Sequence, residues 1–202
     1  MKMLRSIAGI SALCLLLSSC GGDPTDNCGG SPPEQKVYLI NGYNTNLVRY
    51  DKPIDSVTPQ SPKLLANNES PAWNTFSIEL NAAYQHQAKA LPVLQFSLFA
   101  QAMACSPAPP AGKQKLTKIS ITSANDYSDK YPAGRELVDM FESINHGAIK
   151  LTSLLVNSSA PLQLRLKLLE APQYARQNFE VHITLDDGSI YRLKTGDVYF
   201  AL

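Results

Sequence analysis

The chain has 202 residues, a formal net charge of +1 at pH 7 and a charged fraction of 17%. A charge this close to balance provides no basic surface for nucleic acid and no acidic tail for a cationic partner. The length fits one domain with a flexible extension, and it is sufficient to bury a hydrophobic core. We therefore expect a globular domain that does not bind nucleic acid.

The N-terminal residues have the parts of a secretory signal. Lys2 and Arg5 form a basic start, and residues 7–17 form an apolar segment that is too short to span a bilayer. The segment Leu17-Ser18-Ser19-Cys20 follows, and it resembles the lipobox of bacterial lipoproteins. The resemblance implies removal of residues 1–19 and lipid on the Cys20 sulfur, which would anchor the protein to a membrane, expected to be the outer membrane of the cell envelope. The alternative is an ordinary signal peptide that happens to end near a cysteine.

Two thiols remain in the expected mature chain, Cys28 and Cys105, because Cys14 leaves with the signal and the Cys20 sulfur carries the lipid. Export places these thiols in an oxidising compartment, so a disulfide between them is the default expectation. In the chain-entropy model, a bridge that closes so long a loop stabilises the fold by on the order of 4 kcal/mol. The alternative is one buried and one free thiol.

Composition divides the mature chain into two parts. Residues 20–34 are rich in Gly, Asp, Pro, Thr and Asn, which cannot bury apolar surface, so they are predicted to form a flexible lipid-anchored tether. Residues 35–202 form the expected domain. At its start, residues 37–40 and 45–50 are predicted to be two strands, with a turn at Asn41-Gly42 between them.

Alternation of apolar and polar residues predicts the next strands. From Phe76 to Tyr84 every second residue is apolar, which favours a strand over a competing helix at residues 82–90. The same alternation recurs at residues 94–100. Residues 116–122 also form a predicted strand, in which the apolar positions change parity after Leu116 and indicate a bulge.

One segment has the spacing of an α-helix. Leu137, Met140, Phe141 and Ile144 lie at positions i, i+3, i+4 and i+7, which places them on one helical face. A short helix is therefore predicted here, ending near residues 145–147.

The last third of the chain has strand periodicity throughout. Residues 162–168 and 179–185 alternate, Asp187-Gly188 predicts a hairpin turn, and residues 189–194 and 198–202 form the closing strands. Short strands separated by turn residues predict a mainly β fold, a two-layer antiparallel β-sandwich of immunoglobulin-like architecture with one short helix. A closed barrel would produce nearly the same pattern.

Three further segments carry a family resemblance. Ala104-Cys105-Ser106-Pro107, Ile119-Ser120-Ile121-Thr122-Ser123 and Tyr131-Pro132-Ala133-Gly134 resemble small lipoproteins from Bacteroidetes, a family without an established function. The resemblance implies a location in the cell envelope and a disulfide or loop role for Cys105. It implies no activity.

The chain lacks the common catalytic and metal-binding motifs. His86, His146 and His182 do not have the spacing that places two metal ligands on one helical face, and the Gly-x-Ser-x-Gly motif does not occur. His182 lies on the polar side of its strand and is expected to face solvent. We therefore expect no cofactor, no metal ion and no enzymatic activity.

Three weaker signals remain. Asp126 and Asp129 could offer oxygen ligands to calcium, although their spacing does not match a calcium loop, and turn formation or helix capping explains them better. Asp55-Ser56-Val57 resembles a short O-glycosylation signal with Ser56 as the acceptor. Nine tyrosines and Trp73 could form a platform for a sugar or a peptide.

These patterns predict a membrane-anchored envelope lipoprotein that serves as a non-catalytic binding or accessory module. One alternative is a hydrolase whose site is assembled only in three dimensions. The other is a structural or adhesive subunit, for which residues 198–202 would be a strand donated to a neighbour. The sequence does not name the glycan or protein partner.

Overall fold

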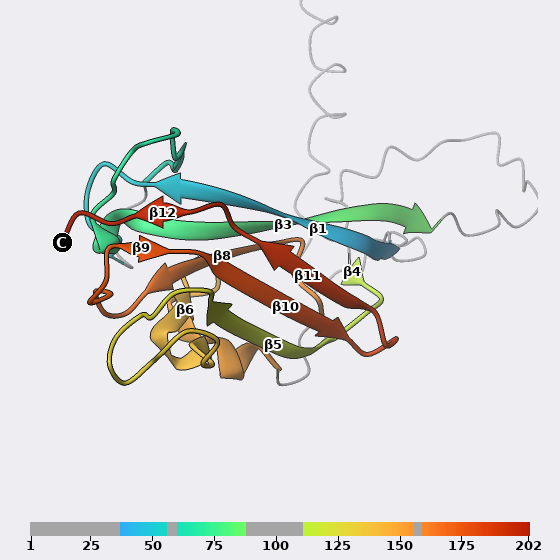
Figure 1. Ribbon diagram of the computed structural model, residues 1–202. Helices are drawn as coiled ribbons and strands as arrows, with labels where there is room; N and C mark the ends of the chain where they lie inside the picture. Colours follow the sequence, from blue (N-terminus) through green and yellow to red (C-terminus); the bar gives the residue numbers. More distant parts are fainter. Residues whose placement is uncertain (1–36, 56–59, 88–110, 156–158) are drawn as a thin grey trace, which may run out of the picture. The chain divides into compact units, whose positions relative to one another are not determined.

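A computed structural model of the chain describes residues 37–55, 60–87, 111–155 and 159–202 (Figure 1). The strand expected at residues 94–100 lies outside these ranges. None of the helices in the described ranges has the length and apolar content that a membrane span requires.

The larger sheet has the strand order β2-β1-β3-β8-β6-β7, and β4 pairs with the start of β1. Its long central pair is β1 with β3, which are antiparallel over their whole length. The strands are β1 (Val37–Arg49), β2 (Lys63–Leu64), β3 (Phe76–Gln87), β4 (Ala111–Gly112), β6 (Phe141–Ser143), β7 (Ile149–Lys150) and β8 (Gln163–Leu168).

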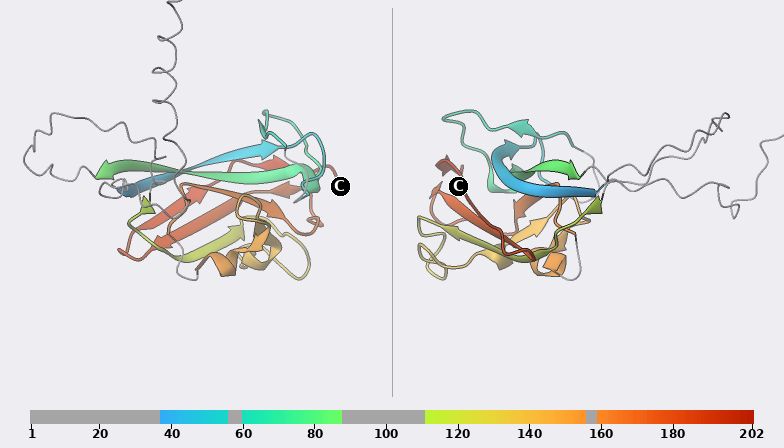
Figure 2. Two further views of the ribbon diagram at one scale, coloured as in Figure 1. Left: turned by 180° about the vertical axis from the view of Figure 1, so that it is seen from behind. Right: turned by 90° about the vertical axis from the view of Figure 1, so that its right-hand side faces the viewer.

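A second sheet has the order β11-β10-β5, and a short pair joins β12 to β9. Figures 1 and 2 show the second sheet lying against the face of the larger one, so the fold is the expected antiparallel β-sandwich. These strands are β5 (Leu116–Ser123), β9 (Arg176–Gln177), β10 (Phe179–Leu185), β11 (Ile190–Lys194) and β12 (Val198–Tyr199).

Alternating apolar residues hold the two layers together. In β10 each odd-numbered residue from Phe179 to Leu185 is buried and each even-numbered residue is only half-buried, as the period of two predicts. Phe179 contacts rings of the opposite layer, with centroids 6.3 Å from Phe76 and 5.5 Å from Phe141. Full burial of a side chain of this size stabilises the fold by about 1.5–3 kcal/mol.

The turn predicted at Asn41-Gly42 is wrong, because β1 runs through it. Both halves of β1 pair with the same partner, β3, and the pairing shifts between Ile40 and Gly42. Asn41 is therefore a bulge residue, the one extra residue that lets the strand continue. An Asn-Gly pair makes a hairpin only when the segments on its two sides pair with each other. Here both segments pair with β3 instead. The strand predicted from Phe76 to Tyr84 is confirmed, and β3 continues to Gln87.

The bulge predicted from the change of parity in β5 is confirmed. Lys118 pairs with Thr184 and Leu116 pairs with Leu185, which leaves Thr117 as the extra residue. Leu116 and Ile119 consequently both point into the core, although three positions separate them.

The α-helix predicted at residues 137–144 is wrong. The segment makes one 3-10 turn, η2 (Val138–Met140), and then enters β6. Leu137, Met140 and Phe141 are buried as their spacing predicted. The backbone N–H of Leu137 donates to Ile121 and that of Ile144 donates to Arg165, so pairing with neighbouring strands replaces the helical hydrogen bonds. Two other 3-10 turns are η1 (Trp73–Thr75) and η3 (Leu151–Leu155).

The hairpin predicted at Asp187-Gly188 is confirmed, although its turn has three residues. Leu185 N donates to Ser189 O at 2.9 Å and Gly188 N donates to Leu185 O at 3.1 Å. Only Gly188 has a positive φ, +86°, so the turn is the type that places one glycine in the left-handed region.

Candidate functional site

A groove crosses the surface between the second half of β1 and the β11–β12 connection. It has a volume of about 700 Å³, within the range of small-molecule sites. We call it the Tyr199 groove. Its lining residues are Thr45, Asn46, Leu47, Leu64, Leu65, Ala66, Asn67, Asn68, Glu69, Gly196, Asp197 and Tyr199.

One wall of the Tyr199 groove ends in a tight turn. Glu69 N donates to Ala66 O at 3.2 Å, and Glu69 Oε2 accepts from Ala66 N at 3.1 Å. Asn68 is in the left-handed region with a φ of 68°, as in a type II turn, and asparagine tolerates this conformation better than most residues. The turn exposes Asn67 and Asn68, whose amides have no partner among the described residues.

The part of the lining that β12 and the residues before it supply includes an aromatic ring and a paired carboxylate. Val198 points into the core, so Tyr199 on the same strand points outward with 48% of its surface exposed. Asp197 accepts from Asn178 Nδ2 at 2.9 Å and from Arg176 Nη2 at 2.8 Å. These two hydrogen bonds, first that of Asn178 and then that of Arg176, lower the pKa of Asp197 below its ordinary value.

Glu69, the second carboxylate of the Tyr199 groove, is also paired. It forms an ion pair with Arg49, which extends from β1. Each carboxylate of the groove is therefore paired with an arginine, and Arg49 also pairs with Asp51. The Tyr199 groove consequently offers hydrogen-bonding groups with little net charge.

Side chains close the gap between β1 and β11 beside the groove. Gln114 makes two bonds to the edge of β1: its Oε1 accepts from Ile40 N at 2.7 Å and its Nε2 donates to Ile40 O at 3.1 Å. Tyr191 OH also donates to Ile40 O, at 3.1 Å, and Thr45 Oγ1 donates to Lys194 O at 3.5 Å. A strand added to β1 would need about 4.8 Å on each side, so none fits between β1 and β11 at Thr45.

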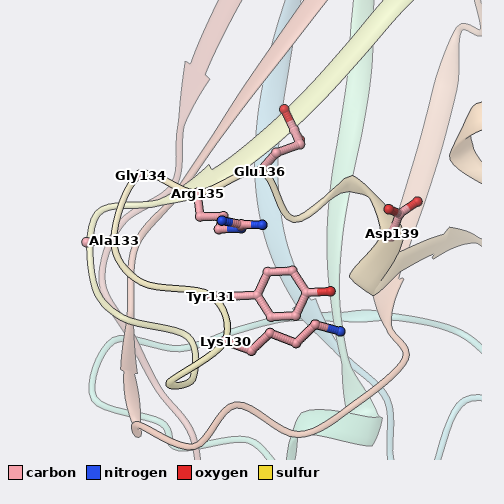
Figure 3. A pocket seen from close by; sticks show the side chains of 7 residues that line it. All are labelled: Lys130, Tyr131, Ala133, Gly134, Arg135, Glu136 and Asp139. Carbon is pink, nitrogen blue, oxygen red and sulfur yellow. The ribbon is translucent and has the colours of Figure 1, made fainter.

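A second hollow, of about 680 Å³, lies in the loop before η2 (Figure 3). We call it the Tyr131 hollow, and Tyr131, Ala133 and Gly134 of the segment with the family resemblance line it. Lys130 Nζ lies 5.1 Å from the centre of the Tyr131 ring. Glu136 accepts from Ile121 N at 2.7 Å and from Ser120, so this carboxylate holds the loop to β5. The remaining charges are those of Lys130, Arg135 and Asp139, and the hollow is formed by exposed side chains.

The described histidines do not form a catalytic arrangement with serine. His146 Nδ1 lies 3.0 Å from Ser143 Oγ, but Ser143 is completely buried, so a substrate cannot reach its oxygen. The third member of this group is the amide of Asn145 and not a carboxylate. His182 lies on the outer face of β10, where Nε2 contacts Glu180 Oε1 at 2.8 Å, as its parity predicted.

Asp126 and Asp129, the calcium candidates, take part in local hydrogen bonds. Asp126 Oδ1 accepts from Ala133 N at 2.7 Å, and Asp129 Oδ1 accepts from Tyr174 OH at 3.0 Å. The described residues contain no group of three or more His, Cys, Asp or Glu side chains that could hold a metal ion. The positions of the two aspartates fit the structural alternative.

The tyrosines do not gather into one platform. Tyr38, Tyr43, Tyr50 and Tyr127 are buried, whereas Tyr84, Tyr174 and Tyr199 are exposed. Tyr199 lines the Tyr199 groove and Tyr131 lines the Tyr131 hollow, and no other described tyrosine lines either of them. No sequence pattern singles out Asn67, Asn68 and Asp197 as site residues. Asparagine pairs in a loop are a signal for a turn, and nothing in the sequence places them in one groove with Tyr199.

Four predicted modification sites lie outside the described residues: Cys20, Cys28, Cys105 and Ser56. Residues 198–202 lie inside the ranges, where the strand β12 covers only Val198 and Tyr199 of the segment. Val198 and Phe200 are buried, and the Phe200 ring meets Phe76 edge-on at 5.0 Å. This packing does not favour a strand donated to a neighbouring molecule.

The fold and the groove define a β-sandwich with a surface groove of little net charge. Comparisons with family models, with curated proteins and with solved structures found no match to this chain.

Proposed function

We propose that this chain is a lipid-anchored, non-catalytic binding module of the bacterial cell envelope, whose ligand binds in the Tyr199 groove. The N-terminal signal and the lipobox at Cys20 support the location. The β-sandwich supports the role, because a rigid sheet frame can present a surface site on its loops.

The observation that carries the proposal is that side-chain amides without a hydrogen-bond partner and an exposed aromatic ring line the same groove. The amides of Asn67 and Asn68 have no partner among the described residues, and Tyr199 in the same lining is half exposed. Buried or paired polar groups serve the fold, whereas unpaired groups that line a hollow are available to a ligand.

A hydrolase is less well supported. The one serine–histidine contact among the described residues is that of Ser143 with His146. Ser143 is completely buried, so its oxygen is inaccessible to a substrate and cannot serve as the nucleophile. A structural role through a donated strand is also less well supported, because Phe200 belongs to the core of its own domain.

A thermal-shift screen of the mature lipoprotein tests the binding role. We expect at least one class among saccharides, amino acids, short peptides and nucleotides to raise the melting temperature, because a ligand that binds only the folded state stabilises it. The shift should disappear in Tyr199→Ala and persist in Tyr174→Ala, which removes a ring of similar exposure (46%) from outside the groove. Equal shifts in both variants, or no shift with any class, would contradict the proposal.

A further inference from the structure

We infer that the Tyr199 groove recognises an uncharged saccharide. This inference rests on the proposed binding role and names the chemical class of the ligand. Three properties of the groove support it: its charge balance, the pairing of an aromatic face with free amides, and its closure against an added strand.

The charge balance favours a neutral ligand. Glu69 is paired with Arg49, and Asp197 is paired with Arg176 and Asn178. A bound anion would face two carboxylates whose arginines are already engaged, and a bound cation would have to compete with those arginines. A polyol requires neither, because it exchanges hydrogen bonds without adding charge.

The polar groups match the hydroxyls of a sugar. Each side-chain amide of Asn67 and Asn68 has one acceptor oxygen and two donor hydrogens, and a sugar hydroxyl can donate and accept. Both amides are presented by one tight turn, so their spacing is restricted before the ligand arrives. Such a pair can bind two hydroxyls of one ring.

The aromatic side chain matches the apolar face of a sugar ring. Tyr199 exposes 48% of its surface, and Leu64, which also lines the groove, exposes 71%. The C–H groups of a pyranose form an apolar face that can stack on an aromatic ring while the hydroxyls point to polar groups. The groove therefore combines both surfaces that a pyranose presents.

An extended peptide is disfavoured because the edge of β1 along the groove is already engaged. A peptide that binds a sheet edge gains affinity by forming main-chain hydrogen bonds with it. Here Leu47 O already accepts from Leu65 N at 2.8 Å, and Thr45 Oγ1 donates to Lys194 O at 3.5 Å. A peptide would lack these bonds and would bind through side chains alone.

The inference can be tested with the full mature lipoprotein in a detergent that has no sugar headgroup. The probes are maltohexaose, laminarihexaose, mannohexaose and xylohexaose, with hexagalacturonic acid as the anionic comparison and a pool of hexapeptides as the peptide comparison. Saturation-transfer NMR detects binding, and calorimetry measures the affinity. We expect at least one neutral hexasaccharide to bind and the anionic one to bind more weakly.

Three variants assign that binding to the groove. Tyr199→Ala should weaken it at least about tenfold, and Tyr199→Phe should stay within about threefold, because the phenyl ring keeps the stacking face. Asn68→Gly removes the amide and keeps the positive φ, so a loss of affinity without a loss of melting temperature reports the hydrogen bonds alone. Tyr174→Ala is the control outside the groove and should bind as the wild type does.

The outcomes separate this inference from the proposed function. Binding of peptides or hexagalacturonic acid, lost in Tyr199→Ala and without binding of neutral sugars, would overturn the saccharide inference and leave the binding role intact. Sugar binding that is insensitive to Tyr199→Ala and Asn68→Gly would also overturn it. The absence of binding by every hexasaccharide at millimolar concentration would do the same.

Discussion

Charged residues on the outer face of the larger sheet form a network that contributes to folding. Glu79 accepts from Arg165 Nε at 2.7 Å and from Asn81 Nδ2 at 2.9 Å, and only 12% of its side chain is exposed. Burial acts to raise the pKa of Glu79, but hydrogen bonds from Asn81 and Arg165 and the charge of Arg165 outweigh it, so the pKa lies below its ordinary value of 4.5.

The lowered pKa of Glu79 predicts acid sensitivity. Its contribution to stability is present above pH 4.5, the ordinary value, and is lost as the pH falls through the folded-state pKa. We expect Glu79→Gln to lower the free energy of unfolding at pH 7 by on the order of 2 kcal/mol and to flatten its decline below about pH 4.5. Denaturant unfolding across pH measures both effects. Asp139→Asn, which changes an exposed carboxylate, should follow the wild type, and an unchanged slope in Glu79→Gln would contradict the prediction.

Replacement of Gln114 by glutamate is expected to give a loss of stability that is larger at neutral pH than at acid pH, the opposite of the pH dependence that Glu79 confers. Its Nε2 donates to Ile40 O and to Asp187 Oδ2, the latter at 2.6 Å. Gln114→Glu removes both donated bonds and places a carboxylate against Asp187, which raises the pKa of the introduced group. We expect a loss of about 2–4 kcal/mol at pH 7 that shrinks as the pH falls toward 4, because protonation restores a donor. Gln114→Ala should lose stability without this recovery, and unfolding curves at the two pH values distinguish the variants.

Single polar residues were the part of the structure that the sequence predicted least. Gln114 lies between a two-residue strand and the start of β5, in a segment without periodicity, and only the fold brings it to the edge of β1. Asn67 and Asn68 are likewise recognisable as turn residues. Their position in one groove with Tyr199 depends on the fold, because more than 100 residues separate them from Tyr199 in the chain.

At the level of elements, prediction succeeded where one rule determined the structure and failed where two rules competed. The alternation in β8 and β10 has no rival interpretation, and both strands formed as expected. The spacing of the apolar residues from Leu137 to Ile144 fits one face of a helix, and it fits the buried positions of a turn followed by a strand equally well. Hydrogen bonds from neighbouring strands decided between them, and these are tertiary contacts that a local pattern does not contain.

The bulge at Asn41 predicts a sharp difference between two variants. Deletion of Asn41 removes the extra residue and leaves Ile40 opposite Tyr84 and Gly42 opposite Ala83, so Tyr38 and Ile40 still face the core. We expect this deletion to cost about 1 kcal/mol or less. Deletion of Asn44, which is paired with Asn81, instead turns the buried Tyr43 toward solvent, and we expect it to cost about 1.5–3 kcal/mol. Circular dichroism melting measures both, and equal melting temperatures would contradict the bulge register.

The C-terminal strand predicts a loss of stability in the isolated protein. Phe200 is 3% exposed and contacts Phe76, so Phe200→Ala should cost about 3–5 kcal/mol. Tyr199→Ala, at the exposed neighbouring position, should cost less than about 1 kcal/mol. Chemical unfolding at low protein concentration measures the two costs. A monomer that tolerates Phe200→Ala would indicate that the segment serves a neighbouring molecule instead.

For the whole molecule, the sandwich was predictable because the apolar residues alternate in most of its strands and turn residues separate them. The proposed ligand site was not, since the groove is formed by segments that are distant in sequence and carry no shared motif. The location was predicted from the N-terminal signal, a local pattern, and stays a prediction.

The lipid anchor can be tested with one substitution. We expect Cys20→Ala to move the protein from the membrane fraction to the soluble fraction, because two acyl chains are needed for stable anchoring and the variant would carry none. Fractionation followed by intact-mass analysis of the mature N-terminus measures this. Cys14→Ala is the matched control and should remain with the membrane. A Cys20→Ala protein that stays in the membrane fraction would rule out the lipobox assignment.

The side chains between β1 and β11 also determine how the two layers are joined on this side. No backbone ladder joins these two described strands, and Gln114, Tyr191 and Thr45 make the connections instead. A substitution of one of these three side chains therefore alters the seam without breaking the backbone pairing of β3, β8 or β10. Thr45 also lines the Tyr199 groove. The seam and the groove consequently share a residue, so a substitution of Thr45 would affect both.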